Sequence, residues 1–338
     1  MKIALVGGIG YMGGRLAAHL RSKRYHVRLT TRRSLKDVPR WVESDQVVHD
    51  DLKNVNILRK HLADRDVVIY LASPDEKEAE RNPIAAIRAG SESVWNVLEA
   101  ISSMPQKSRF IFLSTFHVYG QAGKGTVTER TLPLPVHPYG LGRYIGENIV
   151  QVFRRQHGMK ALCVRMSNVV GSPADFSVPR WTLLLGDLCL QVVTQKKMVL
   201  RSPPTTQRNF IPMENAVRAL EFLARPMAPW PADGVIHLGS PRSLTLDQLA
   251  QRVARCAARE IGNTPTILYL SKTRIDDSAR FPLRYSVRRL QHMGFSWNNS
   301  MDREITTTLK MCREAYAKWG PKIYRVGGLQ AQKPSACA

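Results

Sequence analysis

The sequence contains no uninterrupted run of about 18 apolar residues, so it predicts no transmembrane helix. Its most apolar run, from Trp181 to Val193, is too short and contains Asp187. The N-terminus combines a short apolar run with glycines, whereas a signal peptide has a charged segment, an apolar core and a cleavage site. These absences predict a cytoplasmic protein with no membrane partner.

Cysteine is also scarce. The five cysteines are widely spaced and none forms a CxxC pair. A chain of 338 residues can bury a full core without disulfide bonds, and an odd number of dispersed cysteines disfavours a disulfide framework or a zinc site. No cluster has metal-ligand spacing. We therefore expect reduced thiols and no metal.

Acidic residues are few, since 27 Asp and Glu stand against 50 Lys and Arg, which gives a net charge of +23. Such a charge suits phosphorylated ligands or polyanions. The basic residues are spread along the chain, and no block resembles a nucleic-acid-binding tail. A generally basic surface is the favoured interpretation, and nucleic acid stays open as a disfavoured partner.

Glycine is present where a nucleotide would need it. A short apolar run at residues 2–6 is followed directly by Gly7, Gly10 and Gly13, and then by a helical pattern. Strand, glycine turn and helix in this order predict a dinucleotide site, because the glycines let the backbone approach a pyrophosphate at the helix N-terminus. The cofactor-binding residues predicted here are Gly7, Gly10, Tyr11, Met12 and Gly13.

The segment after the second predicted strand lacks a carboxylate. Dinucleotide sites often place an acidic residue there to hold the ribose 2′-hydroxyl. Here the strand at 27–30 continues into Thr31, Arg32 and Arg33. Two guanidiniums can bind a 2′-phosphate bidentately, which favours NADP(H) over NAD(H). The alternative is that Arg32 and Arg33 are solvated loop charges.

Strand-like and helical segments alternate along the first half of the chain. Strands are predicted at 2–6, 27–30, 46–49, 67–72, 109–113 and 161–165, and helices between them include 83–101 and 144–156. This alternation predicts an α/β fold with a Rossmann-type, doubly wound parallel sheet. We assign residues 1–171 to this dinucleotide-binding domain.

The regularity falls after Gly171. The segments predicted there are a strand at 235–238 and helices at 245–259, 285–293 and 302–313. We assign residues 172–320 mainly to a smaller C-terminal substrate-binding lobe, with segments from about 207 to 240 returning to the main sheet. Residues 321–338 are predicted to form a poorly ordered tail.

Several motifs in order along nearly the whole chain resemble those of the extended short-chain dehydrogenase/reductases. The glycine turn and five further segments carry the resemblance: Asp51-Leu52, Leu71-Ala72-Ser73, Leu113 to Gly120 (LSTFHVYG), Arg165 to Gly171 (RMSNVVG) and Arg208 to Arg218 (RNFIPMENAVR). Within that family the chain looks like the NAD-dependent epimerase/dehydratase group. The resemblance implies an NAD(P)-dependent oxidoreductase or epimerase that acts on a nucleotide-linked sugar.

The resemblance also implies roles for single residues. Thr115 falls at the catalytic Ser/Thr, Tyr139 at the catalytic tyrosine, and Arg143 where the family has lysine. Further cofactor contacts are implied for Asp51, Leu52, Leu71, Ala72, Ser73, Tyr139 and Arg143. Substrate contacts are implied for Thr115, His117, Asn168 and Arg208, of which Arg208 would face a diphosphate.

The chain departs from the family pattern at three places. Gly90 stands where asparagine is common. Phe116 and His117 follow Thr115 where sugar-nucleotide dehydratases carry Asp-Glu, the acid pair that eliminates water, so a dehydratase is disfavoured. Arg143 replaces the lysine.

The last departure bears on the chemistry. Hydride transfer at a carbinol carbon needs a base, and a tyrosine serves when a nearby cation favours the phenolate. Arg143 supplies that charge and can hydrogen-bond a ribose, but it cannot relay a proton because a guanidinium stays protonated. We expect a site that still works in preference to a dead one.

Two other interpretations stay open. One is a dinucleotide-binding protein that has lost catalysis and binds RNA or senses the cofactor, which Arg143 and the +23 charge motivate. The other is a reductase of a carbonyl compound that is not a sugar. The sequence also leaves open a homodimer, the identity of the sugar, and the choice between reductase and epimerase.

Overall fold

The computed structural model describes residues 1–34, 36, 38–39, 41–42, 47–106, 108–120, 125–178, 180–262, 264–271 and 282–323. Its centre is a seven-stranded parallel sheet in the order β12-β7-β5-β4-β1-β2-β3. The strands are β1 (Lys2–Val6), β2 (His26–Thr31), β3 (Val47–His49), β4 (Val67–Tyr70), β5 (Arg109–Thr115), β7 (Ala161–Met166) and β12 (Val235–Leu238).

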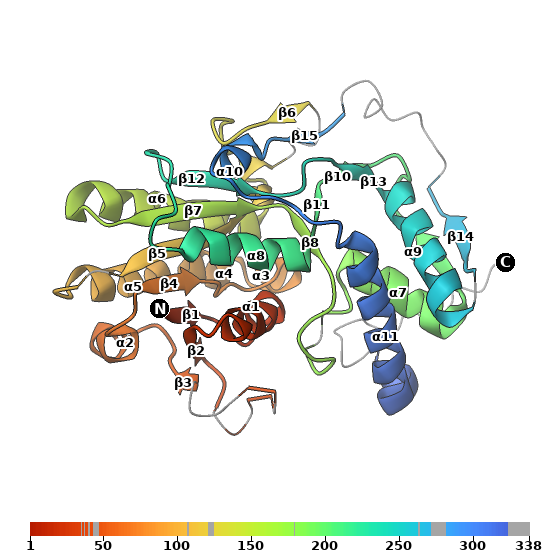
Figure 1. Cartoon of the computed structure of the whole chain (residues 1–338), viewed down its shortest axis with the longest axis horizontal. Helices are drawn as coiled ribbons and strands as arrows, with labels where there is room; N and C mark the ends of the chain where they lie inside the picture. The colour runs from red at the N-terminus through yellow and green to blue at the C-terminus, as the bar shows by residue number, and fades with distance from the viewer. Residues whose placement is uncertain are drawn as a thin grey trace.

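Helices cover both faces of this sheet (Figure 1). They are α1 (Tyr11–Ser22), α8 (Met213–Ala224) and α10 (Arg288–His292) on one face, and α2 (Val55–Leu62), α5 (Glu92–Ser102) and α6 (Pro138–His157) on the other. The period of two along β1 separates the faces, because Ile3 and Leu5 pack towards α1 whereas Ala4 and Val6 pack towards α2 and α5. Both faces are buried, and the predicted α/β fold class is confirmed.

A second hydrophobic core lies beyond the sheet, at the right of Figure 1. It is built mainly from α7 (Leu184–Gln195), α9 (Leu246–Ile261) and α11 (Met301–Trp319), with β9 (Lys197–Leu200) paired to β14 (Thr266–Tyr269). Three more two-stranded pairs link the two parts: β8 (Asn168–Val170) with β11 (Phe210–Pro212), β10 (Gln207–Arg208) with β13 (Leu244–Thr245), and β6 (Thr126–Val127) with β15 (Arg284–Tyr285).

Helix α1 is tied directly to this second core. The Tyr11 hydroxyl donates to the Gly171 carbonyl at 2.7 Å, and burial raises the pKa of Tyr11. Arg15 donates to Ser172 O at 2.9 Å and to Glu304 Oε1 at 2.6 Å. Glu304 lies on α11, is buried, and its Oε1 also accepts the backbone N–H of Glu214, in the first turn of α8, at 3.0 Å. These contacts fix the start of α1 against α11.

The prediction of a single helix at 83–101 is wrong. It consists of α4 (Pro83–Gly90) and α5, and α3 (Glu76–Arg81) precedes it unpredicted. The Ser91 hydroxyl donates to Ile87 O at 2.9 Å, a back-bond that disturbs a helix. Gly90 has a packing reason, since a Cβ there would lie 1.9 Å from Gly142 O on α6.

Helix α6 begins six residues before the predicted position 144. His137 caps it by accepting the Tyr139 N–H on Nδ1 at 3.1 Å, and Pro138 occupies the first turn. Glycine is unfavourable inside a helix, but Gly140 and Gly142 are needed here for close packing. A Cβ at these positions would lie 2.5 Å from His117 O and 2.6 Å from Ala86 O respectively.

Other boundaries also differ from the prediction. Tyr285 belongs to β15, so the helix predicted at 285–293 shrinks to α10, and the helix predicted at 302–313 extends to Trp319. Helix α7 lies in a stretch that was read as irregular. Gln46 and residues 324–338 of the predicted tail lie outside the described residues.

Within the described ranges, no helix has the length and apolar character needed to cross a bilayer. The cysteines described are free and buried; they are Cys163, Cys189, Cys256 and Cys312.

Candidate active site

The strand order reverses between β1 and β4, and a large cavity opens at that point. Chain segments leave β1 in one direction and β4 in the other, which is where open parallel sheets bind ligands. Gly7, with φ of +79°, lies so close to the segment after β4 that a Cβ would meet Ala72 Cα at 2.7 Å. The cavity measures about 1430 Å³. Small-molecule pockets usually measure about 300–1,000 Å³, so this one has room for two ligands.

The structure brings every residue of the predicted site to the wall of this one cavity. These residues are Gly7, Gly10, Tyr11, Met12, Gly13, Arg32, Arg33, Asp51, Leu52, Leu71, Ala72, Ser73, Thr115, His117, Tyr139, Arg143, Asn168 and Arg208. Their roles stay predictions, but all of these residues line the same cavity.

The glycines of the first turn differ in what they meet. A Cβ on Gly13 would lie 2.4 Å from Gly8 O, so packing within the turn requires that glycine. A Cβ on Gly10 would have no heavy atom within 4 Å. Gly10 precedes α1, which has no side-chain cap and no acidic residue in its first turn. Open space at the positive end of an uncapped helix fits a pyrophosphate.

Two arginines and two carboxylates lie at the adenosine end predicted for the cavity. Arg32 and Arg33 follow β2 and are exposed, and neither guanidinium has an ion-pair partner among the described residues. Asp50 is buried and 2.7 Å from His61 Nδ1, so the protein uses its charge internally. Asp51 is half-exposed, 3.7 Å from Lys53 Nζ, and lines the cavity.

Thr115 and Tyr139 come from different elements. Thr115 ends β5 and is buried, and its Oγ1 accepts the His117 N–H at 3.3 Å. That bond uses an acceptor site and leaves the hydroxyl hydrogen able to donate to a ligand. Tyr139 lies in the first turn of α6, one turn before Arg143, so both side chains lie on the same face of the helix.

Arg143 is buried without adequate partners. Its side chain donates one long hydrogen bond, 3.3 Å, to Leu71 O, and its guanidinium lies 5.3 Å from the centre of the Phe112 ring. Its Nε has no hydrogen-bond partner among the described residues. A buried donor without a partner is costly, so this guanidinium fits a site that a hydrogen-bond acceptor such as a ribose completes.

Two histidines flank Tyr139, and a glutamate of α3 faces each of them. The His117 ring contacts Tyr139 edge to face, with centroids 5.6 Å apart, and its Nε2 lies 3.6 Å from Glu76 Oε1. His137 Nε2 lies 3.2 Å from Glu80 Oε1. Burial lowers the pKa of His117, the Glu76 carboxylate opposes that shift, and the nearby His137 and Arg208 add to it. The imidazole of His117 is therefore held mainly neutral.

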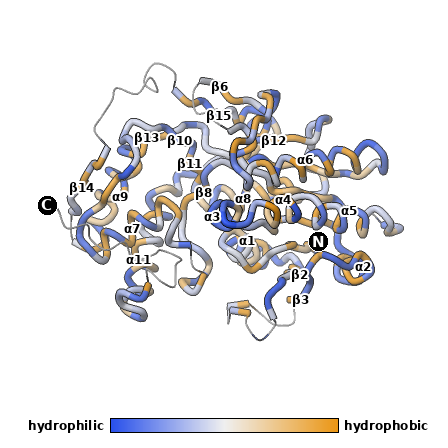
Figure 2. The backbone as a smooth tube through the Cα atoms, turned by 180° about the vertical axis from the view of Figure 1, so that it is seen from behind, coloured by the Kyte–Doolittle hydropathy of each residue, from blue (hydrophilic) through white to orange (hydrophobic). Residues whose placement is uncertain are grey.

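The acidic residues of α3 are the part of the site that was not predicted from the sequence. Asp75, which caps α3, forms an ion pair with Arg180 from the second core's side, and both line the cavity. Helix α3 is mostly hydrophilic (Figure 2), and its one apolar residue, Ala79, is buried. The signal was present as an acidic stretch in which Glu76 and Glu80 stand one helical turn apart.

The segment from Arg165 to Gly171 divides between two places. Its middle lines the cavity, and the Asn168 amide donates to Asn209 O at 3.1 Å beside Arg208. Arg165 does not line the cavity, although its segment was predicted to lie beside cofactor and substrate. It is buried in a bidentate pair with Glu147, with Nη2 to Oε2 at 2.7 Å. Its role is internal because Glu147 already balances its charge.

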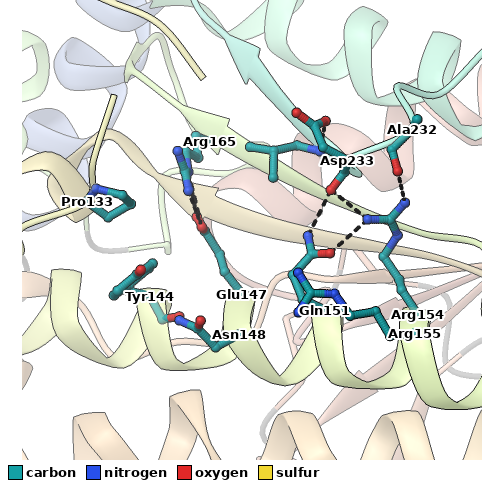
Figure 3. Close-up of a pocket in the computed structure, with 11 residues that line it drawn as sticks. Pro133, Tyr144, Glu147, Asn148, Gln151, Arg154, Arg155, Arg165, Ala232 and Asp233 are labelled. Atoms are coloured by element: carbon teal, nitrogen blue, oxygen red, sulfur yellow. Dashed lines mark hydrogen bonds and ion pairs between the residues drawn. The ribbon is translucent and has the colours of Figure 1, made fainter. Parts of the chain in front are cut away.

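A second cavity of about 550 Å³ lies between α6 and the β7–β12 edge of the sheet (Figure 3). Two of its arginines are engaged with the protein: Arg165 binds Glu147, and Arg154 donates to the carbonyls of Ala232 and Asp233. Behind it, burial raises the pKa of Tyr119 to about 12 and lowers that of His237 to about 3. These buried contacts stabilise the fold and leave few polar groups available to a ligand.

Comparisons with known proteins agree with this geometry. The family model described as "NAD dependent epimerase/dehydratase family" matches residues 3–239. The chain is 24% identical over 186 residues to the UDP-glucose 4-epimerase of Mycoplasma genitalium, which covers 52% of this chain and 54% of that protein. Alignments with several such curated relatives span about half the length of each. Similarity over half of a protein does not establish that this chain has the same activity or substrate.

Solved structures resemble the chain over nearly its whole length. A UDP-glucuronic acid 4-epimerase from Bacillus cereus, in complex with UDP-glucuronic acid and NAD, has a TM-score of 0.73 at 20% identity and covers 94% of this chain and all of that one (100%). The structure of RMD from Pseudomonas aeruginosa, complexed with NADPH, has a TM-score of 0.72 at 18% identity and covers 93% and 99%. At these identities the likeness establishes the fold.

Proposed function

Because this chain belongs to the NAD-dependent epimerase/dehydratase family, we propose that it is an NAD(P)-dependent oxidoreductase or epimerase acting on a nucleotide-linked sugar. One observation carries the proposal. A single cavity large enough for two ligands has an open glycine turn in one part of its wall and Thr115, Tyr139 and Arg208 in another. Relatives named as UDP-sugar epimerases, and a structure holding both UDP-glucuronic acid and NAD, support it.

The cofactor proposed is NADP(H) in preference to NAD(H). Arg32 and Arg33 are exposed beside the cavity at the end of β2, where an acidic residue would otherwise contact the ribose. Their charge complements a 2′-phosphate. Structural neighbours include both an NAD and an NADPH complex, so the fold accommodates either cofactor.

The chain's own groups would handle the proton. A bound nicotinamide would supply the hydride acceptor, while the Tyr139 hydroxyl, as phenolate, takes the proton of the sugar hydroxyl. Arg143, one turn away on the same face of α6, would supply a fixed positive charge to the site, and the Thr115 hydroxyl would hold the reacting oxygen.

The presence of Arg143 also favours an epimerase over a net dehydrogenase. A net dehydrogenase must pass the proton from tyrosine to solvent in every cycle, and an arginine cannot relay it because it stays protonated. An epimerase returns the proton to the same oxygen within the cycle, so Tyr139 needs no relay. A fixed cation is sufficient for that reaction.

The substrate's diphosphate is proposed to lie against Arg208. Arg208 is at the end of β10, and its charge is close enough to act on His117 and Glu76. A diphosphate held there would place the attached sugar near His117 and therefore near Tyr139, which His117 contacts.

A panel of nucleotide sugars tests this function. Purified protein is incubated with NADP⁺ or NAD⁺ and with UDP-glucose, UDP-galactose, UDP-glucuronic acid or dTDP-glucose, and the sugars are analysed by NMR. We expect interconversion of epimers with little accumulation of reduced cofactor. Failure of the protein to convert any of these sugars, or to bind UDP at millimolar concentration, would overturn the proposal and promote a binding role.

A further inference from the structure

We propose that His137 is a positioning residue for Tyr139, which it holds through a neutral imidazole, so that acid releases the turn of α6 that carries the proposed acid/base. The consequence for catalysis rests on the proposed function, whereas the structural part is testable without a substrate. His137 is not among the described residues that line the large cavity, so we expect its effect on a ligand to pass through Tyr139, to which it is hydrogen-bonded.

The hydrogen bonds of His137 select one form of its ring. The backbone N–H of Tyr139 donates to Nδ1 at 3.1 Å, and a backbone amide can only donate, so Nδ1 must carry a lone pair. A neutral imidazole with its lone pair on Nδ1 carries its hydrogen on Nε2. That nitrogen lies 3.2 Å from Glu80 Oε1, which accepts. The two contacts therefore require the same neutral tautomer and use both nitrogens.

The first turn of α6 depends on this residue in two ways. Pro138 has no N–H, so the Tyr139 N–H is the first amide hydrogen of the helix, and the His137 side chain accepts it. The His137 carbonyl accepts the Leu141 N–H at 2.9 Å. Side chain and backbone of His137 thus hold the same turn, in which Tyr139 lies one turn before Arg143.

Acid removes the side-chain half of this arrangement. An imidazolium carries hydrogen on both nitrogens and accepts nothing, so the Tyr139 N–H would face a second N–H group. A positive charge at the N-terminus of α6 is also unfavourable for the helix. Asparagine and serine, the usual caps, keep an acceptor oxygen where histidine changes its charge. With His137 the cap is present while the ring is neutral and is lost as the pH falls.

The charged and titratable groups around His137 come from three elements. Helix α3 contributes Glu80, which accepts from Nε2, and Glu76, which lies 3.6 Å from His117. His117, in the turn after β5, is close enough for the charge of His137 to act on it. Helix α6 itself contributes Tyr139. Glu80 can accept from either form of the ring, whereas the Tyr139 N–H is served by the neutral form alone.

The amide of Tyr139 reports on the cap directly. Labelling with ¹⁵N-tyrosine restricts the spectrum to the amides of ten tyrosines, and the Tyr139 signal is the one that Tyr139→Phe removes. Its hydrogen exchange is measured from about pH 8 to about pH 5, where histidine changes charge. The reference is His137→Asn, whose cap does not titrate. We expect similar protection at about pH 8, and at about pH 5 a wild-type protection about two- to thirtyfold lower, the usual effect of a lost cap.

Two further variants and a control sharpen this measurement. His137→Ala has no acceptor at any pH, so protection should be low throughout. Glu80→Gln keeps an acceptor for the Nε2 hydrogen but removes the charge that stabilises an imidazolium, so the loss of protection should move to lower pH. His292→Ala changes an exposed histidine outside the cavity and should leave the Tyr139 amide as in the wild type.

Turnover gives a second measurement for any nucleotide sugar that the protein converts. The kcat of the wild type should fall with acid more steeply than that of His137→Asn, while UDP and NADP⁺ affinities hardly differ between the two proteins. The charge of His137 also acts on His117. A difference in kcat without a difference in exchange at Tyr139 would therefore be an effect on His117 and would overturn the positioning role.

The other outcomes are equally decisive. The same protection in wild type and His137→Asn at every pH overturns the inference, as does full protection in His137→Ala. An unshifted loss in Glu80→Gln does so too, because the titrating group would not be the ring that Glu80 contacts. Absence of conversion with every sugar overturns the proposed function, and the exchange result still decides whether His137 holds Tyr139.

Discussion

Two buried arginines of this protein have nearly opposite surroundings. Arg143 and Arg165 are each only 5% exposed. Arg165 makes a bidentate pair with Glu147, donates to the Tyr119 hydroxyl at 2.7 Å, and has no unused nitrogen among the described residues. Arg143 makes one hydrogen bond of 3.3 Å and leaves Nε without a partner. The difference indicates that Arg165 serves the fold, whereas Arg143 is kept for a ligand.

The largest effect is expected at Tyr139, the proposed acid/base one helical turn before Arg143. Tyr139→Phe removes one hydroxyl and should lower turnover by about 10²–10⁴-fold, the usual contribution of acid–base catalysis. Steady-state kinetics measures the loss, and cofactor titration serves as the control, since binding should persist. Full turnover in the variant would show that Tyr139 is not the acid/base.

The next effect concerns Arg165 and stability. Arg165→Met would leave Glu147 as an unpaired buried charge, which typically costs about 3–5 kcal/mol of unfolding free energy. Urea denaturation measures this change. A variant as stable as the wild type would show that the pair with Glu147 does not hold the sheet edge.

The matched change at Arg143 should behave differently. Arg143→Met removes a charge that makes one weak protein contact, so stability should hardly change, while cofactor affinity should fall about ten- to a hundredfold. Calorimetric titration and urea denaturation are read on the same sample. A loss of stability equal to that of Arg165→Met would erase the distinction between the two arginines.

Arg143→Lys keeps the charge, and an enzyme adapted to arginine should still lose activity.

Much of this site could be predicted because its residues follow strand ends. Gly7 and Ser73 come shortly after β1 and β4, Thr115 ends β5, and adjacent parallel strands bring their carboxyl ends to one edge. Local patterns that mark strand ends therefore also mark a shared location in space. That is why motifs far apart in the sequence line one cavity.

The parts that escaped prediction depend on how helices pack. Nothing local indicates that Glu76 would face His117, because that contact is set by the placement of α3 against α6. The motif containing Arg165 was recognisable, but its side chain leaves the cavity to meet Glu147, a residue 18 positions earlier. The broken helix at Ser91 and the close contact of Gly90 with Gly142 likewise follow from α6.

Arg208 lines the large cavity, and its guanidinium has no hydrogen bond or ion pair to any described residue, so it extends the comparison to the substrate. Arg208→Ala should weaken binding of UDP by about tenfold or more, because a charge-assisted contact contributes about 1.5–3 kcal/mol. Binding of NADP⁺ to the same variant should be unchanged. Equal loss for both ligands would place Arg208 in general folding and not in a diphosphate site.

The smallest effect is expected at the exposed pair. Arg32→Ala combined with Arg33→Ala should lower NADP⁺ affinity by about tenfold and leave NAD⁺ affinity unaltered, since only the former carries a 2′-phosphate. Fluorescence titration of both cofactors measures the ratio. If wild type binds NAD⁺ as tightly as NADP⁺, these arginines are ordinary surface charges.

The ion pair of Arg15 bears on the order in which the newly made chain matures. Helix α1 is synthesised before α11, and the Glu304 carboxylate that pairs with its Arg15 follows 289 residues later. The same carboxylate also contacts α8, so three helices share one late-arriving group. In a nascent chain that ends before Glu304, Arg15 lacks the carboxylate with which it forms its ion pair. The helix that follows the glycine turn is thus translated long before the residue that completes its contacts.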